Sequence, residues 1–200
     1  MTAQPHDWDS AYQPDSPPPW DIGRPQPAFA RLADAGLLSG RLLDAGCGTG
    51  EHALLAAARG ADALGVDLSS RAIGLARAKA AERDIEARFQ AADALDLGQL
   101  GTSFDTVIDS GLFHVFDDEA RVRYVTSLAS VLRSGGSCYL MCFSDRQPGG
   151  WGPRRVRQAE LRAAFAEGWI IADISADTFT IRTGADTQEA AAWLAAIRRA

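Results

Sequence analysis

The chain has 200 residues, of which 46% are hydrophobic and 23% are charged, which is typical of one globular domain and excludes a disordered or fibrous chain. Its formal net charge is −6 at pH 7, whereas a protein that grips many phosphates needs a basic surface, so nucleic acid is not expected as a partner. No apolar run approaches the ~20 residues that span a bilayer, and the first residues lack the pattern of a signal peptide, so no membrane association is expected.

The first 27 residues differ in composition from the rest of the chain. They hold seven of the nine prolines, together with Trp8, Tyr12 and Trp20. So many prolines exclude a regular helix or strand. A disordered tail is one interpretation, but aromatic residues are unusual in such tails. We favour a lid segment, residues 1–27, that folds over a single domain formed by residues 28–200.

From residue 28 onward, helical and strand patterns alternate. Helices are expected over residues 28–38, 50–59, 69–83 (with Ser69 as the cap), 117–133 and 158–167. Strands are expected over residues 41–45, 62–67, 86–91, 104–109, 137–143 and 168–175, the last extending to 181 if the pattern is followed further. Residues 188–199 are mostly alanine and have a helical composition. We nevertheless predict a strand over residues 191–198, because the sheet needs its C-terminal half and propensity is a weak prior.

This alternation predicts an α/β fold, with a Rossmann-like, mostly parallel sheet of seven strands and helices on both faces. The three cysteines, Cys47, Cys138 and Cys142, form no CxxC pair and lack zinc spacing. No metal site is therefore predicted, and the sparse cysteines suit a reduced, cytoplasmic protein.

A glycine loop, Gly46-Cys47-Gly48-Thr49-Gly50, follows the first predicted strand. Glycines let the backbone approach a ligand closely, and ligands of such sheets bind beyond the carboxyl ends of the strands. Dinucleotide-binding proteins also carry glycine loops, but here the spacing is GxGxG, and Glu51 at the start of the helix would repel a pyrophosphate. Asp44, at the end of the strand, suits an ammonium group. The loop therefore predicts a ligand that carries the charges of an amino acid and no phosphate.

Two further acids follow the next two strands. Asp67 closes the second strand, where a carboxylate can accept hydrogen bonds from both hydroxyls of a ribose. Asp93 follows the third strand, where it can accept from the exocyclic amine of adenine while the backbone N–H of Ala94 serves a ring nitrogen. Each acid alone could be a helix cap or a loop residue. Together, at the ends of three successive strands, they indicate a nucleoside site.

These motifs resemble those of class I S-adenosylmethionine-dependent methyltransferases over residues 28–143 at least. Leu42 to Gly50 is similar to the first motif of that family, Gly65-Val66-Asp67-Leu68-Ser69 to the second, and the segment around Asp93 to the third. The resemblance implies S-adenosylmethionine as the cofactor, an antiparallel C-terminal strand, and Ser110 beside the reacting methyl group. It also implies cofactor contacts from Asp44, Ala45, Gly46, Cys47, Gly48 and Gly50 at the methionine end, from Asp67 and Leu68 at the ribose, and from Asp93 and Ala94 at the adenine.

The end of the fourth strand, Asp109 to His114, borders the reacting methyl in this fold. It lacks the Pro-Pro-aromatic motif of DNA adenine enzymes, and the chain lacks the paired-glutamate loop of protein-arginine enzymes. Cys142 falls inside a predicted strand, which argues against the nucleophile of RNA cytosine enzymes. A small molecule remains as the expected methyl acceptor.

Two segments carry a narrower resemblance. Residues 19–27 are similar to the N-terminal segment of thiopurine and halide/thiol methyltransferases, which implies that Trp20 and Arg24 lie near the cofactor. Residues 152–156 form a basic loop similar to that of bacterial, especially actinobacterial, methyltransferases, some of which act on heterocyclic or aromatic toxins.

The chemistry itself makes few demands, because a sulfonium methyl is already activated and alignment alone contributes about 7–11 kcal/mol. A thiolate or ring nitrogen needs no base, but a hydroxyl gains from one, and His114 is the candidate catalytic base. A histidine that only packs in the loop is the alternative. Phe113 and Trp151 are candidates for the wall of an aromatic acceptor pocket, and Arg154 and Arg155 for binding an anionic or planar substrate. Core packing and solvated charge are the competing interpretations.

Two other functions remain open. A NAD-dependent oxidoreductase of similar architecture is disfavoured by the glycine spacing and by Glu51. A non-catalytic, cofactor-binding regulator is compatible with the sequence, although an intact lid would then be superfluous.

Overall fold

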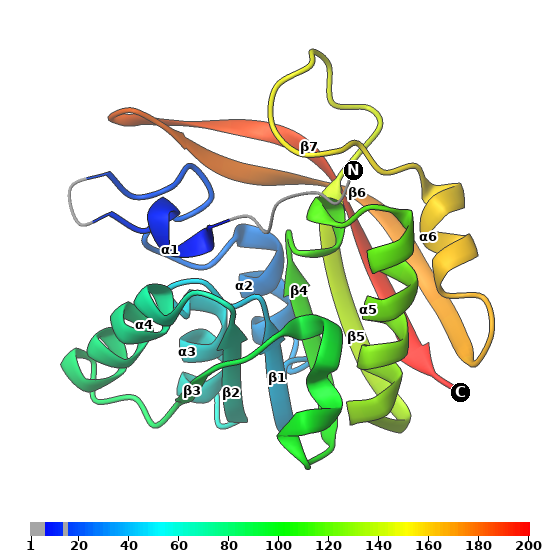
Figure 1. The fold of residues 1–200 in the computed structure, drawn as a ribbon, viewed down its shortest axis with the longest axis horizontal. Helices are drawn as coiled ribbons and strands as arrows, with labels where there is room; N and C mark the ends of the chain where they lie inside the picture. The colour runs from blue at the N-terminus through cyan, green and yellow to red at the C-terminus, as the bar shows by residue number, and fades with distance from the viewer. Residues whose placement is uncertain (1–6, 14–15) are drawn as a thin grey trace.

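The structure is a computed structural model that describes residues 7–13 and 16–200. It contains one seven-stranded sheet in the order β3-β2-β1-β4-β5-β7-β6 (Figure 1). The strands are β1 (Arg41–Ala45), β2 (Asp62–Asp67), β3 (Arg88–Ala91), β4 (Phe104–Ser110), β5 (Leu132–Phe143), β6 (Trp169–Thr183) and β7 (Asp186–Arg199). Strands β1 to β5 are parallel, and β7 lies antiparallel between β5 and β6. The predicted fold class is confirmed.

The alanine-rich C-terminal run is a strand, as predicted, and it begins earlier than expected, at Asp186. Ala192 and Ala195 are buried in the sheet between two neighbouring strands. Small side chains suit this position because the strand has helices and loops packed on its faces. The need to complete the sheet therefore outweighs the helical propensity of alanine.

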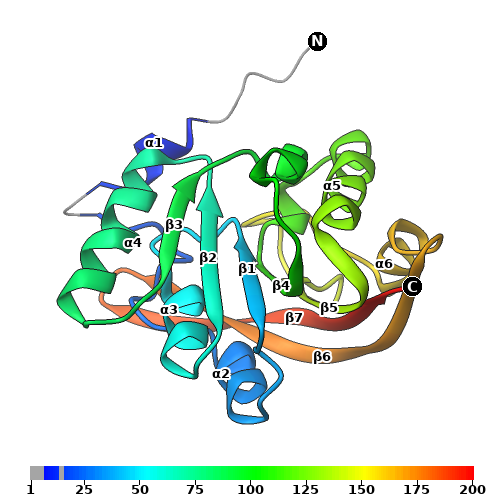
Figure 2. The same ribbon diagram turned by 90° about the horizontal axis from the view of Figure 1, so that it is seen from below.

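Helices cover both faces of the sheet (Figure 2). The first face carries α2 (Pro27–Asp34), α3 (Glu51–Ala58) and α4 (Ser70–Glu82), and the second carries the 3-10 helix η1 (Ala94–Leu100), α5 (Asp118–Val131) and α6 (Gln158–Ala164). Neighbouring residues of β1 show the division: Leu42 joins the core of the first face and Leu43 the core of the second. Successive side chains of a strand point to opposite faces, so one strand feeds both cores.

The starts of two helices agree with the prediction, and Ser69 is the cap that was expected. The Ser69 hydroxyl accepts a hydrogen bond from the backbone N–H of Ala72 at 3.0 Å, and Asp117 caps α5 by accepting from Ala120 at 2.8 Å. The helix predicted over residues 28–38 ends earlier, at Asp34, because the chain turns through Gly36 with a φ of +72°.

Within residues 7–13 and 16–200, no helix is long and apolar enough to cross a membrane, and no group of metal-ligating side chains could hold an ion. The three cysteines are buried and free.

Candidate functional site

The glycine loop connects β1 to α3 at the carboxyl edge of the sheet. Gly46 and Gly50 have φ angles of +71° and +86°, in the left-handed region that favours glycine. A Cβ on Gly46 would lie 3.0 Å from the side chain of Leu112, and one on Gly50 would lie 2.7 Å from the ring of Phe89. Both positions therefore need glycine for conformation and for space, which holds the loop backbone close against the ends of the strands.

Asp44 is buried near the end of β1. Its Oδ2 accepts a hydrogen bond from the backbone N–H of Ala53 at 3.1 Å, whereas Oδ1 is buried and has no hydrogen-bond partner in the part of the chain that the structure describes. Burial, with the charges of Asp67 and Asp109, raises the pKa of Asp44 to about 8. A bound cation would supply the missing partner and favour the carboxylate. This orphaned acceptor therefore fits the ammonium group of the expected cofactor.

Asp67 lies at the end of β2, beside the glycine loop. Its two oxygens accept hydrogen bonds from the backbone N–H groups of Gly48 and Ser69, each at 2.9 Å. A carboxylate has about four acceptor sites, so both oxygens keep capacity for hydroxyl donors. Burial raises its pKa. The neighbouring Leu68 is exposed.

The other predicted cofactor residues lie at the same edge. Asp93 is exposed and caps η1, where its Oδ1 accepts from the N–H of Leu95 at 2.8 Å. Ala94 is buried beside it, and Ser110 is half-buried at the end of β4. The side chain of Ala45 is fully buried in the core, which leaves only its backbone for a ligand. The three acids stand together because the carboxyl ends of parallel strands meet at one edge.

The residues preceding α2 form a strap (residues 7–13 and 16–26), which includes the short helix α1 (Trp8–Ala11). The prediction that prolines exclude a helix from this segment was wrong for these four residues, none of which is a proline. Residues 1–6 and 14–15 of the predicted lid lie outside the described residues. The hydroxyl of Tyr12 accepts a hydrogen bond from Nε1 of Trp20 at 3.2 Å and lies 3.0 Å from where a Cβ on Gly48 would stand. Asp21 accepts from the hydroxyl of Thr49 at 2.9 Å. The strap therefore lies against the glycine loop.

The predicted contact residues of the strap differ in their placement. Trp20 reaches the glycine loop through Tyr12 and is still 47% exposed. Arg24 is exposed.

The strap is also fixed to the hairpin formed by β6 and β7, which extends over it (Figure 1). Nε2 of Gln26 donates to the carbonyl of Thr180, and the N–H of Thr180 donates to Oε1 of Gln26, both at 2.9 Å. The N–H of Arg182 donates to the carbonyl of Pro19 at 2.7 Å. The strap thus connects the glycine loop to the outer strand of the sheet.

Glu51 does not repel a pyrophosphate in the way that the sequence suggested. Glu51 is buried and forms ion pairs with Lys79 at 2.7 Å and with Arg83 at 2.8 Å, both on α4. These hydrogen bonds and charges lower its pKa despite burial. The carboxylate is ionised, but two cations compensate its charge, so it exerts little net repulsion on a pyrophosphate.

Four rings form an aromatic cluster at the end of β4: His114, Phe143, Trp151 and Phe179. His114 belongs to the 3-10 helix η2 (Phe113–Val115), and its ring centroid lies 5.2 Å from Phe143 and 5.9 Å from Phe179. Trp151 packs perpendicular to Phe143 at 5.9 Å and is 41% exposed. A Cβ on Gly111 would lie within 3.5 Å of His114 and Phe179. The cluster therefore lies directly beside the residue that follows β4.

His114 is buried, and its Nδ1 accepts a hydrogen bond from the backbone N–H of Phe143 at 3.0 Å. Burial, together with the charges of Arg121 and Arg155, lowers its pKa to about 3, so the ring is neutral at pH 7. A neutral imidazole has one acceptor nitrogen, and the Phe143 N–H occupies it. The predicted role as a proton acceptor would require this hydrogen bond to break, and that role stays an untested prediction.

Asp109, at the penultimate position of β4, organises the loop that carries His114. Its carboxylate accepts from the N–H groups of Leu112 at 2.7 Å and Phe113 at 3.1 Å, and from the hydroxyl of Tyr124 at 3.0 Å. Burial raises its pKa to about 7. The residue lies at the strand end that the sequence singled out, but its role as the anchor of η2 was not anticipated.

The prediction that Phe113 lines an acceptor pocket is wrong. Phe113 is fully buried in the core of the second face, where its ring packs 6.0 Å from that of Phe165 and beneath the guanidinium of Arg121. Its backbone N–H is held by the carboxylate of Asp109, and its ring belongs to the hydrophobic core.

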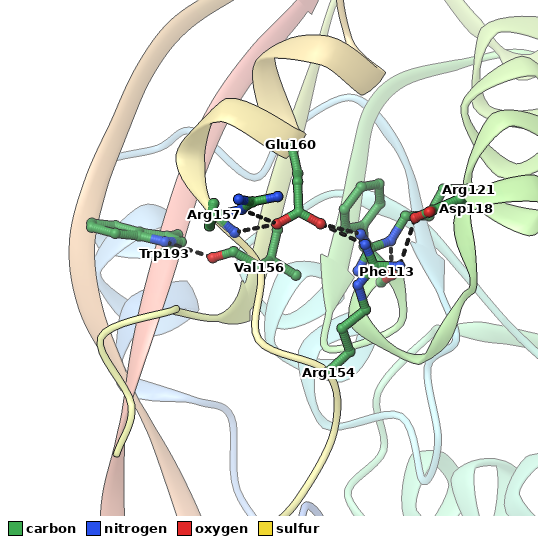
Figure 3. A network of polar contacts seen from close by, with 8 residues as sticks. All are labelled: Phe113, Asp118, Arg121, Arg154, Val156, Arg157, Glu160 and Trp193. Carbon is green, nitrogen blue, oxygen red and sulfur yellow. Dashed lines mark hydrogen bonds and ion pairs between the residues drawn. The ribbon is translucent and has the colours of Figure 1, made fainter. Parts of the chain in front are cut away.

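Arg154 is occupied by ion pairs, and its predicted role in substrate binding stays an untested prediction. Its guanidinium pairs with Asp118 at the start of α5 and with Glu160 at the start of α6, each at 2.6 Å (Figure 3). Glu160 also pairs with Arg121 and Arg157. Arg154 thus joins two helices across the loop that precedes α6.

Arg155 holds its own loop together. Its guanidinium donates to four backbone carbonyls, those of Gln147, Gly149, Trp151 and Pro153. It also lies 5.4 Å from the ring centroid of Phe143 and 5.6 Å from that of Trp151. Direct substrate binding by Arg155 would compete with these contacts. The geometry therefore favours a role for Arg155 in positioning Trp151.

Sequence reasoning missed four residues of this region: Tyr12, Gln26, Phe143 and Phe179. Phe143 ends a predicted strand at the carboxyl edge, a position that signals a site residue. Phe179 and Gln26 depend on the register of the long hairpin, for which the sequence carries no comparable signal. A recess lined by Arg41, Arg88 and Thr102 among others lies at the opposite, amino end of the strands.

Comparison with known proteins places this site in context. The family model described as "Methyltransferase domain" matches residues 42–136, which run from β1 to β5. A 2-heptyl-1-hydroxyquinolin-4(1H)-one methyltransferase of Mycobacteroides abscessus is 36% identical over 177 residues, which are 84% of this chain and 78% of that protein. A probable thiol methyltransferase 2 of Arabidopsis thaliana is 26% identical over 76% of this chain and 68% of its own.

A solved structure is similar over nearly the whole chain. It was described for the conversion of a disulfide bond into a thioacetal group during echinomycin biosynthesis. It is 40% identical, covers 91% of this chain and 85% of its own, and superposes with a TM-score of 0.85. The likeness therefore extends over most of the chain and is not confined to the segment that the family model matches.

Proposed function

Because this chain belongs to the S-adenosylmethionine-dependent methyltransferases, we propose that it transfers a methyl group to sulfur, nitrogen or oxygen of a small aromatic or heterocyclic molecule. Membership in that family removes the support for an oxidoreductase, and S-adenosylmethionine is the cofactor. When bound, this cofactor supplies an activated sulfonium methyl group. The protein's own residues have to bind it, align an acceptor and exclude water.

The cofactor contacts follow from the acids at the carboxyl edge. We assign Asp44, with its unpartnered Oδ1, to the ammonium group, and Asp67 to the ribose hydroxyls. Asp93 and Ala94 are assigned to the adenine. The backbone of the glycine loop serves the methionine end, because its glycines hold it close to the strands.

One observation carries the assignment of the acceptor: the aromatic cluster lies beside Gly111, at the end of the strand that borders the reacting methyl in this fold. Aromatic faces and edges favour a planar ring. The relatives support the same chemistry, because one is named for a hydroxyquinolinone and another for thiols. In this assignment, Trp151 contributes an exposed face to the acceptor.

The strap completes the site. Its contacts with Gly48 and Thr49 support a lid that covers the bound cofactor and keeps water from the methyl group. The free, buried cysteines suit a reducing compartment, and we propose that the enzyme acts in the cytoplasm.

Incubation of the purified protein with S-adenosylmethionine labelled at the methyl group tests this proposal. The acceptor panel contains aryl thiols, phenols, N-hydroxy heterocycles and N-heterocycles, with aliphatic thiols and alcohols of similar size as controls. We expect label in aromatic products and little in the aliphatic controls. Transfer to aliphatic acceptors alone, or to none, would contradict the aromatic assignment.

A further inference from the structure

The polar groups around His114 select the ionisation state of the acceptor. We propose that this site takes aromatic acceptors that are already anions, such as an aryl thiolate or the oxyanion of an acidic hydroxyl on a heteroaromatic ring, and that His114 donates a hydrogen bond to the anion through Nε2. The inference rests on the proposed function and goes further, because it names the acceptor class and replaces a base with a donor.

The proton of the neutral His114 ring has a defined position. The N–H of Phe143 donates to Nδ1 at 3.0 Å, so the proton of the neutral ring resides on Nε2. Within residues 7–13 and 16–200, Nε2 has no hydrogen-bond partner, and the Nε2 side of the ring lies next to Gly111. The ring therefore presents an N–H donor, and no acceptor, to the place where the fourth strand ends.

The charges around the His114 ring are positive. The charged groups that act on the ring are Arg121 of α5 and Arg155 of the loop that carries Trp151, and both are cations. Arg155 is held by backbone carbonyls and forms no ion pair with the described carboxylates. A positive surrounding disfavours a protonated imidazole and favours an anion beside it.

A cluster of three arginines near η2 adds to this positive charge (Figure 3). Three guanidiniums, those of Arg121, Arg154 and Arg157, share only two carboxylates, those of Asp118 and Glu160. One positive charge is left over. Nη2 of Arg121 is buried without a hydrogen-bond partner among the described residues, so part of this charge is not compensated locally.

The described residues near His114 offer no other free base. Asp109 is fully buried, and its oxygens already accept from two backbone N–H groups and from Tyr124. The hydroxyl of Tyr12 lies in the strap, and burial raises its pKa, so it stays protonated at neutral pH. An acceptor must therefore lose its proton to solvent before transfer. Its anion then forms the bond to the methyl carbon, the bond from that carbon to the sulfonium sulfur breaks, and the electron pair goes to sulfur.

The pH dependence of kcat/KM for the full-length enzyme tests this inference, with para-substituted thiophenols and phenols of graded pKa as acceptors. We expect each rise of kcat/KM with pH to have its midpoint at the acceptor's own pKa, so that the midpoint moves from one acceptor to the next. A midpoint near neutrality that is shared by all acceptors and disappears in His114→Gln would overturn the inference and establish a base.

Two variants distinguish hydrogen-bond donation by His114 from a role in packing alone. His114→Phe removes the donor and should lower kcat/KM by about 100-fold, whereas His114→Gln keeps an amide N–H and should recover a large part of the loss with an unchanged pH midpoint. Equal losses in both variants would contradict a donor role. Binding of S-adenosylhomocysteine, measured by calorimetry, should be unchanged in both variants.

A second measurement needs no turnover. In protein labelled with 15N-histidine, NMR should show His114 protonated at Nε2 and not at Nδ1 from pH 5 to pH 9, with His114→Gln identifying its signals. Titration of this ring near neutrality would overturn the inference while leaving methyl transfer intact. Absence of transfer to every acceptor would instead refute the proposed function.

Discussion

The side chain of Gln26 forms two hydrogen bonds with the backbone of Thr180, each 2.9 Å long, although the residues are 154 positions apart in the sequence. Both residues are buried. Thr180 follows Phe179 of the aromatic cluster, and Gln26 ends the strap that touches the glycine loop. This contact therefore joins the proposed cofactor lid to the proposed acceptor site.

We expect Gln26→Ala to destabilise the protein by about 1–3 kcal/mol, because it leaves the buried N–H and C=O of Thr180 without partners. Urea unfolding measures this change. Arg31→Ala is the matched control, since it breaks an exposed ion pair with Asp177 of the same strand and should cost less than about 1 kcal/mol. Equal effects of the two substitutions would mean that the Gln26 contact is no stronger than a surface pair.

Deletion of residues 1–24 should reduce turnover while leaving the domain folded. The deletion removes Tyr12 and Asp21, which contact the glycine loop, and Trp20, which donates to Tyr12, but it keeps Gln26. Circular dichroism and steady-state kinetics against the full chain measure the two properties. Full activity of the shortened protein would refute the lid.

Asp67→Ala should weaken the binding of S-adenosylhomocysteine by at least about tenfold, because a carboxylate that accepts from hydroxyls makes strong hydrogen bonds. Calorimetry measures the affinity. Asp62→Ala is the control and should leave the affinity unchanged. Asp62 lies at the exposed opposite end of the same strand, where it pairs with Arg41 and Arg88. If both variants bind like the parent, the ribose assignment fails.

The stability of the unliganded protein should fall as the pH rises from about 6.5 to about 8. Below this window, the buried histidines His52 and His114 act in the opposite direction, because burial lowers their pKa values to about 4 and about 3 from the ordinary 6.5. Burial raises the pKa of Asp44 to about 8 and that of Asp109 to about 7, above the ordinary value of 3.8. In this window the folded protein holds protons that the unfolded chain has released, so a higher pH favours unfolding. Thermal unfolding across this range measures the slope.

Asp44→Asn removes one of the two groups and should flatten this dependence. In the parent, a bound ammonium group favours the carboxylate of Asp44, so binding of the cofactor product below pH 8 should release protons. Calorimetry in buffers of different ionisation enthalpy detects them. A stability that rises steadily from pH 6.5 to pH 8 would contradict the buried, neutral state of these acids.

Much of the fold could be predicted because its signals are local. Caps such as Ser69, the glycine loop and the acids at the strand ends each act within a few residues. Even the alanine-rich strand, Asp186–Arg199, followed from the requirement that an open sheet be completed.

The acceptor side was harder because its contacts are long-range. Phe113 and His114 are neighbours in sequence, yet one joins the core and the other the aromatic cluster, depending on how Asp109 anchors the loop. Arg154 and Arg155 also look alike in sequence. Arg154 pairs with carboxylates of two helices, whereas Arg155 donates to carbonyls of its own loop. Tertiary packing decides which partners each arginine has.

A crystal structure of the enzyme with S-adenosylhomocysteine and an acidic aryl acceptor tests the central claim most directly. We predict that the acceptor ring lies against Trp151 and Phe179 and that its reacting heteroatom lies about 2.7–3.2 Å from Nε2 of His114. An ordered acceptor bound away from the end of β4, or one whose heteroatom contacts a carboxylate in place of His114, would contradict this account.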